Sequence, residues 1–103
     1  MPVAIDITGP QCRAARALVE WPIGEVARRS GVSTAAIADF EARRADPGPE
    51  ARRRLLGALE EGGAVFIAEN GGGVGVRLKY SRRDTRAVNK WEGEGGTAGD
   101  DDV

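Results

Sequence analysis

The segment Ile23–Arg43 constrains the fold of this chain more tightly than any other part of the sequence. Apolar residues recur at helical spacing on both sides of Gly31, a residue type that tolerates the positive φ of a tight turn. Ala27 is small enough to let two short helices approach each other closely. We therefore predict a helix over residues 23–30, a turn at Gly31 and a second helix over residues 34–42.

The second of these helices has one apolar face. Ile37 and Phe40 are three residues apart and share one side of the helix, and Val26 and Val32 complete the apolar wedge. Ser33 is a favourable N-cap for this helix. These requirements, met together within about 20 residues, predict a helix-turn-helix, an arrangement that places its second helix in the major groove of DNA.

The stretch before this segment predicts another helix over residues 9–20. Thr8 and Gln11 have the spacing of a capping box, and Pro10 suits the first helical turn. The expected apolar face of this helix consists of Cys12, Ala15, Leu18 and Val19. Ahead of it, the alternation of apolar and polar residues over 3–8 predicts a short strand.

After a turn-forming run at 46–49, the sequence predicts a helix over residues 49–61. Its expected apolar stripe consists of Leu55, Leu56 and Leu59. Apolar residues at 65–68 and alternating apolar residues over 74–78 flank the turn at 70–73, which predicts a β-hairpin. A lone hairpin is marginal in water, so we expect the N-terminal strand, a helix or a second subunit to cover it.

The charges are unevenly distributed along the chain. It carries 15 basic and 16 acidic residues, but four of the acids lie from Glu94 onward, so residues 1–92 hold 12 acids against 15 bases. Nearly all the bases are arginine, which suits bidentate contact with phosphate or guanine. Codon bias also produces arginine-rich chains, so the number of arginines alone does not decide the function.

The residue inventory argues against an enzyme. The chain has no histidine and one cysteine, Cys12, so it lacks histidine acid–base chemistry, an internal disulfide and a soft-ligand metal site. We predict no catalytic residues, metal or cofactor, and a core role for Cys12. The glycine run at 71–75 lacks the lysine of a phosphate-binding loop and is interpreted as a hairpin turn. No apolar stretch approaches the ~20 residues that span a bilayer, and no secretory signal is evident. We expect a cytoplasmic, nucleoid-associated protein without membrane contact.

Residues 8–59 resemble the XRE family, the lambda-repressor-like helix-turn-helix regulators. The run Gln-Cys-Arg-Ala-Ala-Arg-Ala-Leu at 11–18 is similar to the first helix of a short alphaproteobacterial subgroup, which continues into a glycine-rich hairpin with a Val-Arg-Leu-Lys-like end. The resemblance implies a mainly α, four-to-five-helix DNA-binding domain that acts as a dimer on inverted repeats. It also implies a structural salt bridge between Arg16 and Glu41. Family members often begin the second helix with Ser-Gln, whereas this chain has Pro22 and Ile23.

Three regions follow from these patterns. Residues 1–62 are expected to form the DNA-binding domain, and residues 63–80 a β-hairpin that joins two protomers. Residues 81–103 begin as a basic segment, in which Asp84 is a candidate cap for a short helix, and end as an acidic, glycine-rich and flexible tail.

The predicted DNA contacts lie on and just after the second helix of the helix-turn-helix. They are Ser33, Thr34, Ala35, Ala38, Asp39, Arg43 and Arg44. An alternative role for Asp39 is an i,i+4 ion pair that orients Arg43. We expect specificity to depend on Thr34, Arg43 and DNA shape. A candidate second DNA-contact stripe consists of Arg77, Lys79, Arg82 and Arg83.

The expected function is a dimeric, sequence-specific regulator of transcription that binds double-stranded DNA. Arg52, Arg53 and Arg54 lie near the start of a helix, where positive charge opposes the dipole, and this mild cost points to a partner. Two alternatives remain open. One is an antitoxin that masks a toxin with the segment after Ser81. The other is a regulator that docks on a protein such as RNA polymerase through the hairpin and Trp91.

Overall fold

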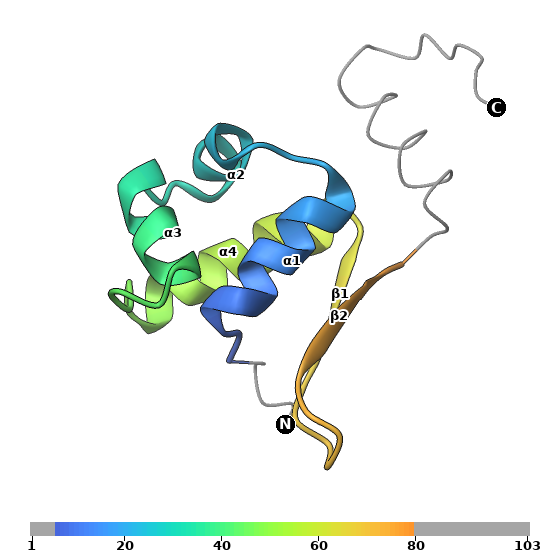
Figure 1. Ribbon diagram of the computed structural model, residues 1–103. Helices are drawn as coiled ribbons and strands as arrows, with labels where there is room; N and C mark the ends of the chain where they lie inside the picture. The colour runs from blue at the N-terminus through green and yellow to red at the C-terminus, as the bar shows by residue number, and fades with distance from the viewer. Residues whose placement is uncertain (1–5, 80–103) are drawn as a thin grey trace, which may run out of the picture.

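A computed structural model of the protein describes residues 6–79 (Figure 1). Its elements are α1 (Gly9–Val19), α2 (Ile23–Ser30), α3 (Thr34–Glu41), α4 (Pro49–Glu61), β1 (Ala64–Ile67) and β2 (Gly75–Leu78). The described part of the chain is therefore mainly α, with four helices followed by a two-stranded antiparallel hairpin. Residues 6–8 of the predicted N-terminal strand form no strand, and residues 3–5 of it, like everything predicted from residue 80 onward, lie outside the described residues.

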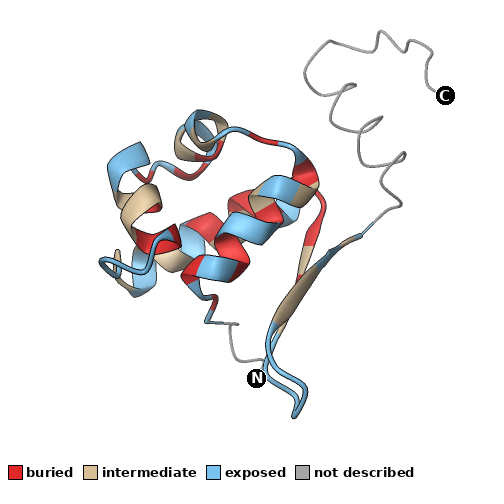
Figure 2. Cartoon of the chain, in the orientation of Figure 1, coloured by how far each residue is buried: buried red, intermediate tan, exposed pale blue. Residues whose placement is uncertain are grey.

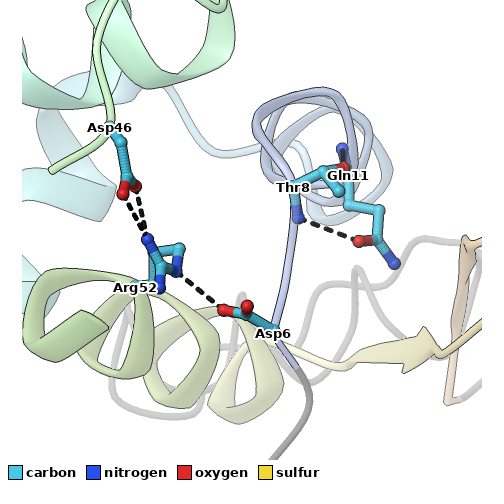
Figure 3. Close-up of polar contacts among 5 residues, drawn as sticks. All are labelled: Asp6, Thr8, Gln11, Asp46 and Arg52. Atoms are coloured by element: carbon cyan, nitrogen blue, oxygen red, sulfur yellow. Dashed lines mark hydrogen bonds and ion pairs between the residues drawn. The ribbon is translucent and has the colours of Figure 1, made fainter. Parts of the chain in front are cut away.

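Gln11 connects the start of α1 to the end of the hairpin beside its connecting loop. The predicted capping box is confirmed: the Thr8 hydroxyl accepts a hydrogen bond from the Gln11 N–H, and the Gln11 side-chain oxygen accepts one from the Thr8 N–H (Figure 3). The amide nitrogen of the same side chain donates to the carbonyl oxygens of Ile67, at 3.3 Å, and Gly75, at 2.8 Å. A glutamate at this position could cap the helix but could not donate to the strands.

The core lies where α1 faces α3, α4 and the hairpin (Figure 2). Cys12, Ala15, Val26, Ile37, Leu55 and Leu59 are fully buried. Leu18 and Leu56, predicted on the inner faces of their helices, are not part of this buried set. Ala64 and Phe66 of β1 belong to the same cluster as the helical residues, so α1 and α4 cover the hairpin and the hydrophobic core is continuous.

Two glycines allow the close packing of this core. A Cβ on Gly9 would lie 1.9 Å from the carbonyl oxygen of Phe40, so α1 begins in direct contact with the end of α3. A Cβ on Gly62 would lie 2.6 Å from the ring of Trp21, which packs over the end of α4. The Trp21 ring is also covered by the Arg29 guanidinium, 4.4 Å from the ring centroid.

The structural ion pair implied by the family resemblance is present. Arg16 Nη2 lies 2.8 Å from Glu41 Oε1, and Arg16 Nε donates to Glu41 Oε2 at 2.9 Å. The hydrogen bond from Arg16 to the buried carboxylate raises the pKa of the guanidinium. The Cys12 thiol also contacts Glu41, at 3.5 Å. Together these contacts join the middle of α1 to the end of α3.

In the hairpin, β1 pairs with β2 in the register Ala64 with Leu78 and Ile67 with Gly75. Both ends of β1 lie one residue before the predicted limits, whereas β2 starts one residue late, after Val74, and ends at Leu78 as predicted. The connecting loop bends at Gly71 and Gly73, whose φ angles are +96° and +92°. Their N–H groups both donate to the Glu69 carboxylate at 3.0 Å, as expected of a turn that its own chain completes. Within residues 6–79, no helix is both long and apolar enough to cross a membrane.

Candidate nucleic-acid interface

The turn between α2 and α3 has the geometry that the sequence predicts. Gly31 adopts φ +78° and donates its N–H to the Ala27 carbonyl at 2.9 Å, which ends α2. The buried Ser30 hydroxyl then accepts a hydrogen bond from the Val32 N–H at 3.1 Å. This fixed bend sets the angle at which α3 leaves the core.

One side of α3 is buried and the other is open to solvent (Figure 2). Ile37, Phe40 and Glu41 face the core. The predicted contact residues lie on the remaining surface: Ser33, Thr34, Ala35, Arg43 and Arg44 are exposed, while Ala38 and Asp39 are half-buried. All seven residues are therefore at least partly exposed, and all lie on α3 or directly beside it.

The start of α3 combines a cap with a helix dipole. The Ser33 hydroxyl accepts a hydrogen bond from the Ala36 N–H at 3.1 Å, which confirms Ser33 as the N-cap. A single cap satisfies only one of the N–H groups in the first turn. The first turn of α3 contains no acidic residue, so the positive end of the dipole is not neutralised by its own helix.

The predicted pairing of Asp39 with Arg43 is wrong. Asp39 Oδ1 instead accepts from Arg44 at 3.0 Å. The reason is that α3 ends at Glu41 and the chain turns at Arg43, so that Arg43 is not one helical turn beyond Asp39. Asp39 thus neutralises Arg44 and leaves Arg43 without an acidic partner among the described residues.

Arg43 has an unusual backbone conformation. The Arg43 N–H donates to the Phe40 carbonyl at 3.0 Å and the Arg44 N–H donates to the Asp39 carbonyl at 2.8 Å, the two bonds of a Schellman motif. The residue at the position of Arg43 in this motif is left-handed, with φ +63° here, and glycine is preferred there. An arginine in this conformation costs about 1 kcal/mol relative to glycine. The chain thus tolerates backbone strain at an exposed cation.

Most other arginines of the helices are neutralised by nearby carboxylates. Glu25 accepts from Arg29 and Arg28, which lowers the pKa of Glu25. Glu50 likewise pairs with both Arg53 and Arg54, which lowers its pKa. These pairs lie within α2 and α4, respectively.

Arg52 pairs with acids outside its own helix. Its guanidinium contacts Asp46 in the loop before α4 and Asp6 near the start of the described chain (Figure 3). The hydrogen bond from Arg52 lowers the pKa of Asp46. Because Arg52, Arg53 and Arg54 all have internal partners, the positive start of α4 does not by itself indicate an external one.

Three arginines between residues 6 and 79 have no ion pair: Arg13, Arg43 and Arg77. Arg77 is exposed on β2 and donates to the Leu78 carbonyl at 3.1 Å. Lys79 of the predicted second stripe is also exposed, while Arg82 and Arg83 lie outside the described residues. Arg13, exposed on α1, was not predicted. The signal that could have found it is its position opposite the apolar face of α1.

Arg43 and Arg44 also border an open hollow of about 560 Å³ between the end of α3 and the start of α1. Pro10 of α1, Phe40 of α3 and Val74 before β2 contribute to its lining. A group held by Arg43 would therefore meet free space on the α1 side.

No family model matches this sequence, and no curated protein matches it either.

Proposed function

We propose that the protein is a lambda-repressor-like helix-turn-helix regulator that binds double-stranded DNA with α3 in the major groove. One observation carries the proposal: just beyond α3 lies Arg43, an exposed cation without an ion pair in the described chain, held in a conformation that favours glycine. Strain of this kind is concentrated at functional positions. The charge complements phosphate, and the neighbouring helix face is open.

The small side chains of α3 suit close approach to base edges. Thr34 is able to hydrogen-bond a base or a phosphate, and Ala35 and Ala38 fit against thymine methyl groups. Asp39 either accepts from a cytosine amino group or, as in the free protein, orients Arg44. With few long polar side chains on α3, sequence preference would depend on Thr34, Arg43 and the shape of the duplex.

The proposed regulator acts as a homodimer joined through the hairpin. α1 lies between α3 and the hairpin, so a partner on the hairpin would leave α3 free for DNA (Figure 1). Two α3 helices related by a twofold axis would read half-sites about 34 Å apart, one turn of the duplex, or a multiple of that distance.

Selection from a random duplex library, followed by footprinting, tests the proposal. We expect one enriched inverted repeat that the wild-type protein protects. The double variant Thr34→Ala/Arg43→Ala should lose protection with an unchanged melting temperature, because both side chains are exposed. Arg53→Ala is the matched control, since it removes an exposed arginine that pairs with Glu50. The proposal is wrong if no sequence is enriched or if the double variant still protects the site.

A further inference from the structure

The outer edge of β2 carries backbone groups whose direction follows from the strand register. The Lys79 N–H donates to the Gly63 carbonyl at 2.7 Å, so these two residues form a hydrogen-bonded pair. Hydrogen-bonded and non-bonded pairs alternate along an antiparallel ladder. In the observed register, Arg77 and Gly75 therefore bond to β1, while the N–H and C=O groups of Val76 and Leu78 point away from it.

Nothing in the described chain pairs with this outer edge, because β1 and β2 form a sheet of two strands. The Leu78 carbonyl accepts from the guanidinium of its neighbour Arg77, at 3.1 Å. Val74 lies just before β2. Its side chain is large and apolar, yet the residue is 46% exposed to solvent. An uncovered edge beside an exposed apolar side chain is a template for another strand.

We propose that a second copy of this chain occupies this edge, its β2 antiparallel to the first, with Val76 opposite the partner's Val76. The inference rests on the proposed dimer and specifies its interface. Two hairpins joined in this way form one four-stranded sheet with both α1 helices on the same face, since facing residues of paired strands share a side of the sheet.

Among the twofold registers centred on Val76, Arg77 or Leu78, charge selects the first. Centring the pair on Arg77 places Arg77 opposite the partner's Arg77, and centring it on Leu78 places Arg77 opposite the partner's Lys79. Like charges directly opposite each other destabilise a sheet. Centring the pair on Val76 places Arg77 opposite the partner's Gly75, which carries no charge.

The same register also covers the exposed apolar residue. One residue before β2, Val74 would lie opposite the partner's Leu78, so that its exposed side chain gains an apolar neighbour. The outward N–H and C=O of Val76 would exchange two hydrogen bonds with the partner's Val76. The apolar contact thus favours the arrangement that the charges select, and the outward backbone groups can form hydrogen bonds in it.

Isotope-filtered NMR of wild-type protein, mixed from labelled and unlabelled chains, tests the register. We expect an intermolecular contact between the α protons of Gly75 and the partner's Arg77, since facing residues of a non-bonded pair are closest at Cα. A contact between the α protons of the two Arg77 residues would overturn the register. Contacts from residues 1–5 of the same chain to Val76 would show that the chain covers its own edge, and would overturn the proposal.

Val76→Pro provides a second measurement. Proline removes the outward N–H of Val76 but none of the hydrogen bonds to β1, and Val76→Ile keeps that N–H. By analytical ultracentrifugation, we expect Val76→Pro to weaken dimerisation at least about tenfold, because two symmetric hydrogen bonds are lost. Val76→Ile should dimerise like the wild type. Equal dimerisation of both variants, with the hairpin intact by NMR, would contradict the proposal.

These measurements are made without DNA, so the two proposals fail separately. A dimer with the expected register that enriches no duplex would refute DNA recognition but keep the interface. Footprinting by a protein without the Gly75–Arg77 contact would keep DNA recognition and refute the interface.

Discussion

At the scale of single residues, Glu20 and Arg43 end two different helices in the same way. Glu20 has φ +63° and donates its N–H to the Ala17 carbonyl, while the Trp21 N–H donates to the Arg16 carbonyl. This is the Schellman pattern found at Arg43, again without glycine. The two positions therefore carry similar backbone strain, but only Arg43 adjoins the exposed side of α3.

That similarity provides a matched pair of variants. Arg43→Gly and Glu20→Gly each introduce a residue that adopts positive φ without a Cβ clash, and Arg43→Gly should raise the free energy of unfolding by up to about 1 kcal/mol. Urea denaturation measures this gain. Only Arg43→Gly should lower affinity for the selected duplex. A loss of DNA affinity in both variants would mean that helix-end dynamics, and not the Arg43 charge, controls binding.

Cys12 makes the free energy of unfolding fall at alkaline pH. Burial and the neighbouring Glu41 raise the pKa of the Cys12 thiol from 9.0 to about 12. The raised pKa means that the folded protein favours the neutral thiol. The stability that depends on keeping this thiol neutral is fully present below pH 9 and is lost as the pH rises toward 12. The maximum loss is about 1.4 kcal/mol for each pH unit between the two pKa values. In urea titrations at several pH values, Cys12→Ala should remove this part of the pH dependence, and an unchanged slope would contradict the assignment.

At the scale of elements, the packing of the helices depends on glycines that have no room for a side chain. Because Gly9 has no side chain, α1 can contact the α3 backbone. In the same way, Gly62 lets the end of α4 contact Trp21. Gly57, inside α4, would meet nothing within 4 Å if it carried a Cβ. Packing thus requires glycine at Gly9 but not at Gly57.

Alanine substitutions separate these roles. Gly9→Ala should destabilise the protein by about 1–3 kcal/mol or more, because the new methyl group overlaps the Phe40 carbonyl and forces the backbone to move. Gly57→Ala should stabilise it by about 1 kcal/mol through helix propensity alone. Thermal unfolding followed by circular dichroism checks both signs. A neutral Gly9→Ala variant would show that α1 and α3 are not in contact.

At the scale of the whole molecule, the distribution of charge determines how binding responds to salt. Many described arginines are already paired with acids, so few remain to replace counterions on DNA. Affinity should still fall as salt rises, with a slope in log–log form of about −0.9 for each phosphate contacted.

Arg43→Ala should reduce the magnitude of that slope by about 1, as expected for the loss of one phosphate contact. Fluorescence anisotropy of a labelled duplex at a series of salt concentrations measures both slopes. Arg54→Ala is the comparison variant, because Arg54 is paired with Glu50. Equal slopes for the wild type and Arg43→Ala would remove Arg43 from the phosphate-contact surface.

Local sequence signals were sufficient to predict the four helices, although α1 and α3 each end one residue before the predicted limit. Gly31, Ser33 and the Thr8–Gln11 pair act on neighbouring backbone groups, so the bounds of α2 and the start of α3 follow from the chain itself. The exposed side of α3 followed likewise from the spacing of Ile37 and Phe40. The pairing of Arg16 with Glu41 came from the family resemblance, since residues 25 positions apart have no local signal.

Other features depended on how distant segments meet. Only the folded chain shows that Gln11 donates to the two strands, that Asp39 pairs with Arg44, and that Asp6 lies beside Arg52. Helix period and capping are set by contacts within a few residues, so sequence alone determined them. Ion pairs and close approaches between elements are set by the angles at which helices cross, and those angles are decided by the packing of the whole core.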